Sequence, residues 1–281
     1  MSVVWFNGQF FDGTLPLDSH DRGFLLGDGV FETVAVINHK LLWLDEHLQR
    51  MSHAAAELGI PFNAEGLFAG LGEVLKRSQA QFEVLRITLS RGKTARGLAG
   101  DGTSPSLLMT LDGFDAANLF QPCRLKVSAV RRNAFAPSSR LKTLSYIDGI
   151  AAAREVAEEA DDALMLNTHG HVASSTVANL FLLRGNELIT PSLNQGILPG
   201  IMRRVLLDNA KKMGSVPVEK IISLEDLFRA DAVFLCNSLR FLKPVTMLNG
   251  EPLGKRSIVD LENGLSAMAK KQCGIDPRAL M

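Results

Sequence analysis

Residues 138–149 read SSRLKTLSYIDG and place Lys142 between a polar turn and the start of a helix. A lysine at such a position is usually a solvated surface charge, but a lysine in an apolar pocket can lose its proton and attack an aldehyde. These residues alone leave both interpretations open. The segments on either side of them decide the fold class.

Downstream of Lys142, predicted hairpins are interleaved with helices. The sequence indicates a helix over 147–159, a strand over 163–166 and two strands that pair around Arg184-Gly185-Asn186. A further helix is expected to begin near Ile201 and to run to Gly214, where a C-terminal glycine cap belongs. This order is typical of an α+β chain and shows no regular βαβ alternation.

Upstream, apolar residues recur at steps of three and four positions. One such series predicts a helix over 44–58, and a second series predicts a helix around 67–75, followed by strands over 84–89 and 106–111. Turn residues fill 112–118, and strand signals resume at Leu125. We therefore expect a smaller N-terminal α+β domain over 1–113 and a larger C-terminal domain over 120–281.

Composition excludes several classes of protein. The 281 residues are 46% hydrophobic, enough for a large core, and the 30 basic and 30 acidic residues cancel, so we expect no nucleic-acid partner. Three separated cysteines indicate a reducing compartment, and no run of 18 apolar residues occurs. We expect a soluble cytoplasmic protein without a membrane partner. The histidines show no spacing that converges on a metal, so we expect no metal site.

Residues 196–204, GILPGIMRR, form a glycine-bracketed turn that leads into a helix. Such a turn can present backbone N–H groups and the positive end of the helix dipole to an anion such as phosphate. An ordinary helix start with a proline in its entry turn is the alternative.

The segments together resemble the fold type IV family of pyridoxal-phosphate enzymes, which includes aminodeoxychorismate lyase and the D-amino acid and branched-chain aminotransferases. The resemblance runs from Phe6 to about Val245 and depends on the order of its landmarks more than on any one of them. These are Arg22 with Gly27-Asp28-Gly29-Val30-Phe31-Glu32-Thr33, His47-Leu48-Gln49-Arg50, Arg91 with Arg96-Gly97, Leu141-Lys142-Thr143-Leu144-Ser145-Tyr146, Ala178-Asn179-Leu180-Phe181, Leu198-Pro199-Gly200-Ile201-Met202-Arg203 and Cys236-Asn237-Ser238-Leu239.

The resemblance implies a two-domain D-amino acid aminotransferase-like fold of α+β class, with pyridoxal 5′-phosphate between the domains. Lys142 would be both the Schiff-base lysine and the acid/base for the substrate's α-proton. Arg50 would pair with the phosphate, an ion pair suited to its forked donors. The other implied cofactor contacts are Tyr146, Ser174, the backbone N–H groups of Ile201 and Met202, Asn237 and Ser238, and the implied substrate contacts are Phe31 and Arg96. For Tyr146 a packing role is as consistent with the resemblance as a contact with the ring hydroxyl.

Two positions depart from the aminotransferase pattern. Met202 stands where a threonine is common, and Ser174 stands where the family has a glutamate under the pyridine nitrogen. A carboxylate keeps that nitrogen protonated and makes the ring a strong electron sink, whereas a serine hydroxyl supplies no charge. Transamination needs that sink more than elimination of a good leaving group does, so Ser174 favours a lyase.

The sequence therefore predicts cleavage of 4-amino-4-deoxychorismate to 4-aminobenzoate and pyruvate. A D-amino acid or branched-chain aminotransferase is the first alternative, and a non-catalytic binding protein on the same fold is the second. In each case the expected partner is a small amino acid-like molecule. The resemblance also implies a homodimer in which the partner subunit helps to wall the site.

Overall fold

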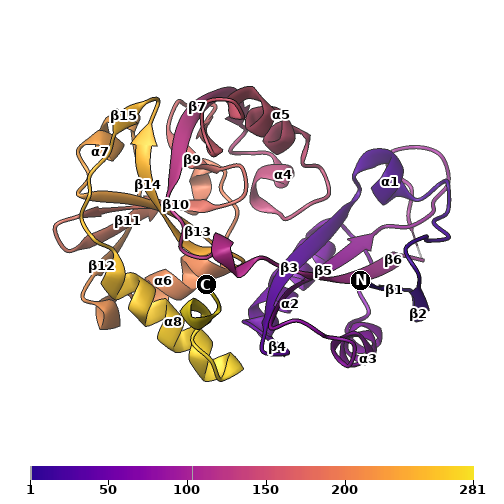
Figure 1. Cartoon of the computed structure of the whole chain (residues 1–281). Helices are drawn as coiled ribbons and strands as arrows, with labels where there is room; N and C mark the ends of the chain where they lie inside the picture. The colour runs from indigo at the N-terminus through magenta and orange to yellow at the C-terminus, as the bar shows by residue number, and fades with distance from the viewer. Residues whose placement is uncertain (1, 103) are drawn as a thin grey trace.

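The computed structural model describes residues 2–102 and 104–281, which form two β-sheets with helices packed on them (Figure 1). The first sheet is antiparallel throughout, in the order β2-β1-β6-β5-β3-β4. Its strands are β1 (Val3–Phe6), β2 (Gln9–Phe11), β3 (Gly29–Ile37), β4 (Lys40–Leu41), β5 (Phe82–Ser90) and β6 (Ser106–Gly113).

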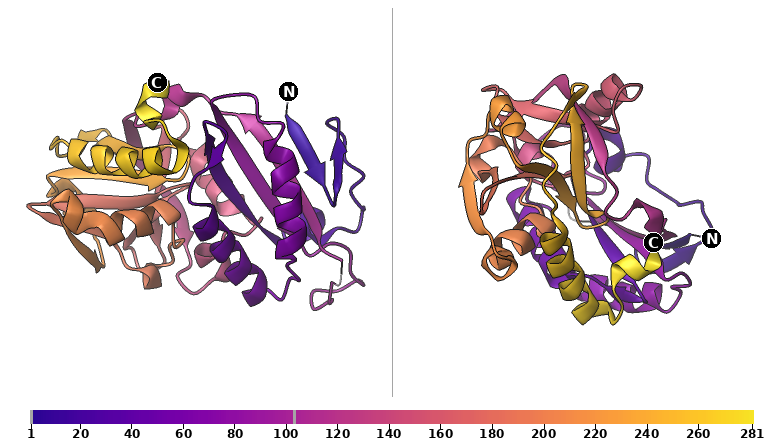
Figure 2. Two further views of the ribbon diagram at one scale, coloured as in Figure 1. Left: turned by 90° about the horizontal axis from the view of Figure 1, so that it is seen from below. Right: turned by 60° about the vertical axis from the view of Figure 1, so that its left-hand side comes forward.

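Two amphipathic helices cover one face of this sheet, α2 (Leu44–Glu57) and α3 (Ala64–Leu75), and lie side by side in Figure 2. Both predicted helices are confirmed, and most of each predicted apolar series is buried: Leu48, Met51 and Ala55 in α2, and Leu67, Leu71 and Val74 in α3. The chain leaves α2 through Gly59, whose φ of 63° is accessible to glycine at little cost. The short helix α1 (Arg22–Leu26) lies at the end of the sheet where β3 begins.

The second sheet has the order β12-β11-β10-β13-β14-β7-β8-β9, and β9 also pairs with β10. This last pairing closes β10, β13, β14, β7, β8 and β9 into a small barrel. The predicted hairpin around Arg184-Gly185-Asn186 is confirmed as β10 to β11. The strands are β7 (Cys123–Arg132), β8 (Asp162–Asn167), β9 (Val172–Ser175), β10 (Asn179–Arg184), β11 (Glu187–Pro191), β12 (Val216–Lys220), β13 (Ala232–Asn237), β14 (Phe241–Leu248) and β15 (Glu251–Pro252), which pairs with β14.

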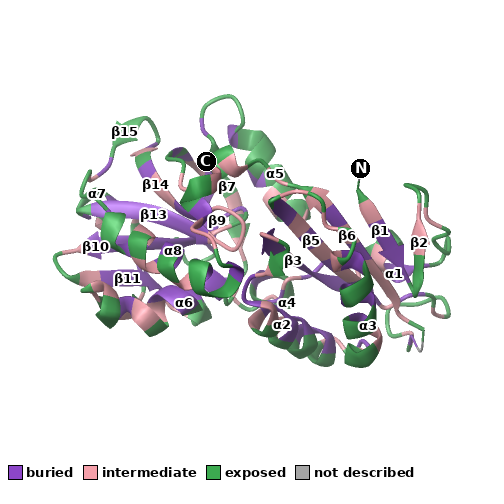
Figure 3. Cartoon of the chain, turned by 60° about the horizontal axis from the view of Figure 1, so that its bottom comes forward, coloured by how far each residue is buried: buried purple, intermediate pink, exposed green. Residues whose placement is uncertain are grey.

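Helices surround the second sheet, and their outward faces are exposed while the strands between them are buried (Figure 3). The α-helices are α4 (Pro137–Arg140), α5 (Ile147–Val156), α6 (Ile201–Asn209), α7 (Leu224–Phe228) and α8 (Val259–Cys273). The described residues also form the 3₁₀ turns η1 (Ala116–Asn118), η2 (Leu193–Gln195), η3 (Ala210–Met213) and η4 (Pro277–Leu280).

The C-terminal ends of α5 and α6 can be compared with the ends predicted from the sequence. Helix α5 ends at Val156, three residues before the predicted end, because the following Glu158 and Glu159 would place negative charge at the negative end of the helix dipole. Helix α6 continues through η3 to Gly214, whose φ of 74° confirms the predicted glycine cap.

A shared core joins the two sheets. Ile37 and Trp43 from the first sheet's side belong to one buried cluster with Phe241 and Leu265 from the second. In addition, the Asn38 side chain donates a hydrogen bond to the carbonyl oxygen of Cys273 at 2.8 Å. The connection between the sheets, after Gly113 and before Cys123, contains the boundary expected from the sequence, and the division into two domains stays a prediction. Among the described residues, no helix has both the length and the apolar character to cross a membrane.

Candidate active site

Lys142 lies where the two sheets meet. Its carbonyl oxygen accepts a hydrogen bond from the Phe31 amide at 2.9 Å, and the Leu144 amide donates to the Gly29 carbonyl oxygen at 2.9 Å. The segment that carries Lys142 is thus held against the start of β3. The ammonium nitrogen lies 3.3 Å from the Tyr146 hydroxyl and 4.4 Å from the centroid of the Phe31 ring. Its surroundings are aromatic rather than acidic.

A cavity of about 470 Å³ opens beside this lysine, within the size range of small-molecule sites. Nine of the ten predicted site residues line it: Phe31, Arg50, Lys142, Tyr146, Ser174, Ile201, Met202, Asn237 and Ser238. The lining has five basic side chains, Arg50, Arg86, Arg132, Lys142 and Arg240, against one carboxylate among the described lining residues, Asp148. This charge balance suits a ligand that carries several negative charges.

Arg50, on α2, belongs to a buried polar cluster with Glu32 and His47. Arg50 donates from Nε to Glu32 Oε1 at 2.7 Å and from Nη2 to Oε2 at 2.6 Å, and His47 Nδ1 lies 2.7 Å from Oε2. Burial raises the pKa of the Glu32 carboxyl, but the charge and hydrogen bonds of Arg50, with the hydrogen bond from His47, lower it to about 2. Glu32 is therefore ionised at neutral pH. Burial lowers the pKa of His47, which favours the neutral imidazole.

The turn before α6 is built for close approach of an anion. No side chain of the described residues caps this helix, whose N-cap is Gly200, so its first N–H groups remain available. Arg50 Nη1 donates to the Pro199 carbonyl oxygen at 3.2 Å, which brings the guanidinium group to the same turn. Asn179 Nδ2 braces the turn through the Leu198 carbonyl oxygen at 2.9 Å. This donor set fits the phosphate of pyridoxal 5′-phosphate.

Ser174 lies in β9 and is 4% exposed. Its hydroxyl donates to the Ser175 carbonyl oxygen at 2.8 Å, and because a hydroxyl can rotate, it can instead donate to a neutral ring nitrogen on the cavity side. The position contributes no charge to the cavity wall. The structure thus keeps a neutral group at the position where the resemblance implies the pyridine-nitrogen partner.

Asn237 ends β13, and Ser238 begins the turn that leads to β14. Asn237 Oδ1 accepts from the amides of Leu239 at 3.1 Å and Arg240 at 2.8 Å, and this shapes the turn so that Ser238 lines the cavity. The oxygen of Asn237 is already used within the turn. Ser238 is thus the member of the pair whose side chain suits a cofactor contact.

Arg86 and Arg132 line the cavity but were not among the predicted site residues. Arg86, on β5, lies with its guanidinium carbon 3.8 Å from the centroid of the Phe31 ring. Arg132, at the end of β7, donates from Nη2 to the Ser175 carbonyl oxygen at 3.3 Å, and its buried Nε has no partner in the described chain. Burial lowers the pKa of both guanidinium groups. Arg86 is the single arginine of its strand, which is a signal in the sequence, whereas β7 contains three arginines and nothing in its sequence distinguishes Arg132.

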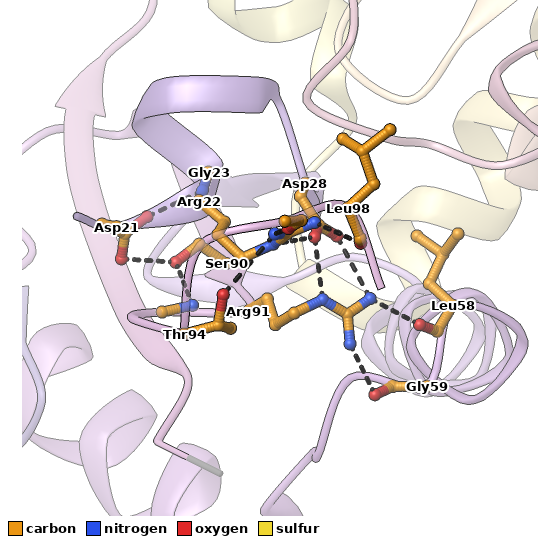
Figure 4. Close-up of polar contacts among 12 residues, drawn as sticks. Asp21, Arg22, Gly23, Asp28, Leu58, Gly59, Ser90, Arg91, Thr94 and Leu98 are labelled. Atoms are coloured by element: carbon orange, nitrogen blue, oxygen red, sulfur yellow. Dashed lines mark hydrogen bonds and ion pairs between the residues drawn. The ribbon is translucent and has the colours of Figure 1, made fainter. Parts of the chain in front are cut away.

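Arg96 is exposed and does not line the cavity of its own chain. It lies in the loop after β5, which Arg22 and Asp28 hold to α1 (Figure 4). Asp28 accepts from Arg22 Nε at 2.7 Å and from Arg91 Nε at 2.8 Å, and Arg22 donates to the carbonyl oxygens of Gly97 at 2.6 Å and Leu98 at 2.9 Å. The role of Arg96 in substrate binding stays a prediction.

Comparisons with known proteins agree with this geometry. A family model described as Amino-transferase class IV matches residues 29–248. The chain is 28% identical to an aminodeoxychorismate lyase of Bacillus subtilis, over 96% of this chain and 94% of that one. It is also 28% identical to a D-alanine aminotransferase of Bacillus licheniformis, over 89% and 90% of the two chains. A lyase and a transaminase are thus matched at the same identity.

Comparison with solved structures also finds both a lyase and a transaminase. A putative 4-amino-4-deoxychorismate lyase from Legionella pneumophila superposes with a TM-score of 0.84 at 33% identity, over 90% of this chain and 95% of that one. A branched-chain amino acid aminotransferase of T.th., in complex with N-(5′-phosphopyridoxyl)-L-glutamate, gives 0.86 at 25% identity, over 97% and 94%. Members of the family thus bind pyridoxal phosphate, and the predicted fold is confirmed. This chain, with its lysine between two sheets and its arginine beside a helix start, belongs to the class IV aminotransferase family.

Proposed function

We propose that the protein cleaves 4-amino-4-deoxychorismate to 4-aminobenzoate and pyruvate with pyridoxal 5′-phosphate as cofactor. The observation that carries this proposal is Ser174, a neutral group in the cavity wall where a transaminase of this family places a carboxylate. The excess of basic side chains in the cavity also supports the proposal. The cavity would hold the two carboxylates of the substrate as well as the phosphate of the cofactor.

Different residues of the cavity would bind different parts of the cofactor. Arg50 and the N–H groups of Ile201 and Met202 would bind the phosphate, with Ser238 as a side-chain donor. Ser174 would meet the ring nitrogen and Tyr146 the ring hydroxyl. When bound, pyridoxal phosphate supplies an aldehyde that condenses with amines and a ring that withdraws electrons from the carbon bearing the amine.

Lys142 Nζ would take the proton from the ring carbon that carries the substrate amine. The electron pair of that C–H bond becomes the last double bond of the aromatic ring. The adjacent C–O bond breaks, and its electron pair leaves with the enolpyruvyl oxygen, which takes a proton and gives pyruvate by tautomerisation. The Tyr146 hydroxyl, 3.3 Å from Nζ, holds the amine in place, and Phe31 packs beside it. Arg86, next to Phe31, would bind a substrate carboxylate.

We also propose a homodimer in which the partner subunit completes the site. Large apolar side chains are exposed on α1 and on the loop that it holds, and Phe24 is 73% and Leu98 83% exposed. Contiguous exposed apolar surface is typical of a protein–protein interface. Contact with a second subunit would cover these side chains and bring Arg96 toward a cavity. Light scattering should therefore give twice the mass of one chain.

An aminotransferase for D- or branched-chain amino acids is the second candidate, because the D-alanine aminotransferase relative is as similar as the lyase relative. Product analysis separates the two functions. Purified protein with aminodeoxychorismate alone should release 4-aminobenzoate and pyruvate in equal amounts without consuming a keto acid. Protein with D-alanine or L-leucine and 2-oxoglutarate should form no glutamate. Rapid glutamate formation without cleavage of aminodeoxychorismate would replace the lyase by the transaminase, and binding without turnover would indicate a binding protein.

A further inference from the structure

We infer that Glu32 is a positioning residue for the cofactor phosphate, and that it acts by fixing Arg50 in the orientation that leaves a pair of N–H groups for the phosphate oxygens. The inference rests on the proposed binding of pyridoxal phosphate. Glu32 itself does not line the cavity, so it would act only through Arg50.

The number of donors on Arg50 supports this role. A guanidinium group has five N–H bonds. Glu32 takes one from Nε and one from Nη2, and the Pro199 carbonyl oxygen takes one from Nη1. One N–H therefore remains on each terminal nitrogen, and a bidentate contact with phosphate uses such a pair.

Burial makes this orientation rigid. The Glu32 side chain is completely buried and that of Arg50 is 11% exposed. On its other side, Glu32 is fixed by His47, whose side chain is 1% exposed. The three side chains come from β3 and from one face of α2, so the helix and the strand hold the arginine before any ligand arrives. A preorganised donor loses less conformational freedom on binding.

The charge of Glu32 has an opposite effect, because it offsets the positive charge of Arg50 that attracts the phosphate. The two effects predict opposite results for Glu32→Gln. If orientation dominates, the substitution weakens phosphate binding. If charge compensation dominates, it strengthens phosphate binding. We expect the first, because glutamine replaces one carboxylate oxygen by an NH₂ group, and in either orientation the donors of that group would face Nε or Nη2 of Arg50.

The test compares pyridoxal 5′-phosphate with pyridoxal, which lacks the phosphate. Equilibrium dialysis of the full chain, freed of cofactor, gives both dissociation constants, and the ratio of pyridoxal to pyridoxal-phosphate constants reports the phosphate contribution alone. In Glu32→Gln this ratio should fall by about tenfold, the size expected when one hydrogen bond to a charged group is lost. A general loss of stability would weaken both ligands and leave the ratio unchanged.

Glu83→Gln is the matched control, because Glu83 is a buried carboxylate of the same sheet that accepts from Ser78 and does not line the cavity. Its ratio should equal that of the unmodified protein. Glu32→Asp keeps the buried charge but shortens the reach to Arg50, so it should also lower the ratio. It provides the test if Glu32→Gln does not fold.

Arg50→Ala separates the inference from the proposed function. If Arg50→Ala leaves the ratio unchanged, the proposed phosphate site is wrong and the inference is wrong with it. If Arg50→Ala lowers the ratio but neither Glu32 variant lowers it, the inference alone is wrong. The inference alone is also wrong if Arg50→Ala lowers the ratio and one of the Glu32 variants raises it. In the Arg50→Ala background, Glu32→Gln should have no further effect on the ratio, because Glu32 acts through Arg50.

Discussion

Replacing Ser174 by glutamate should convert the site toward transamination. A hydrogen bond between a carboxylate and a charged ring nitrogen contributes about 1.5–3 kcal/mol. At 1.36 kcal/mol per pKa unit, this raises the pKa of the ring nitrogen by roughly one to two units. The protonated ring is the better electron sink, so amino transfer should accelerate by on the order of tenfold while pyruvate release stays level or falls.

The surroundings of Ser174 set two conditions on this experiment. The position is 4% exposed, so an unpaired carboxylate there would destabilise the fold by several kcal/mol. Arg132 lies close by, donates to the Ser175 carbonyl oxygen and has a buried Nε without a partner in the described structure. It would compete with the ring nitrogen for the new glutamate. The double variant Ser174→Glu/Arg132→Gln removes this competitor.

The assay follows conversion of the bound cofactor to its pyridoxamine form by absorbance, with D-alanine or L-leucine and no keto acid. Ser174→Gln is the matched control, because it adds the same length without charge. Cofactor binding is measured first for each variant. If Ser174→Gln and Ser174→Glu convert the cofactor at the same rate, or if the unmodified protein already converts it rapidly, then Ser174 does not steer the reaction and the argument for a lyase is wrong.

Three further predictions concern the lysine, the acid stability and the phosphate turn. Borohydride should bleach the near-visible band of the protein and peptide mapping should place the reduced adduct on Lys142, whereas an adduct that persists in Lys142→Ala would contradict the assignment. The pKa of the Glu32 carboxyl is lowered from 4.5 to about 2, and this shift should stabilise the fold by about 3 kcal/mol above pH 4.5. Urea unfolding should show that this stabilisation is lost as the pH falls through 2. Glu32→Gln should show no such loss. Gly200→Ala would place a Cβ 2.0 Å from Asn179 Oδ1 and should weaken pyridoxal-phosphate binding by at least about tenfold, whereas Gly72→Ala, where the new Cβ meets nothing within 4 Å, should leave that dissociation constant unchanged.

The local pattern of the chain was sufficient to predict α2 and α3, and the family resemblance pointed to Lys142, but neither predicted which residues contact the site residues. The three and four residue spacing from Leu44 to Leu58 belongs to one helix, so its burial could be predicted from adjacent residues. The pairing of Glu32 with Arg50 spans 18 positions and depends on how α2 crosses β3, which no local pattern specifies. A signal for it was present: Glu32 is a lone charge in an apolar strand, and His47 and Arg50 share one helix face.

Arg86 and Arg132 show the same limit at longer range. They come from different sheets, and only the packing of one sheet against the other brings both to a single cavity. Arg96 is exposed in the single chain, and the sequence of one chain contains no pattern that specifies the proposed contact with a second subunit. Motif order therefore identified the side chains that touch the cavity in most cases, while the residues that orient them required the fold.

The hold of Arg22 on the loop after β5 has a consequence for how this family can diverge. Arg22 donates hydrogen bonds to the backbone carbonyl oxygens of Gly97 and Leu98, and every amino acid provides such an oxygen. The side chains of Arg96 and Leu98 can therefore be exchanged without releasing the loop from α1, whereas Gly92 and Gly97 have φ of 72° and 127°, which other residues rarely adopt. If Arg96 has the proposed substrate role, substitutions there change the specificity while the path of the backbone stays the same. A library at Arg96 and Leu98, with Arg22, Asp28, Gly92 and Gly97 kept, would test the proposed substrate role by selection for new substrates.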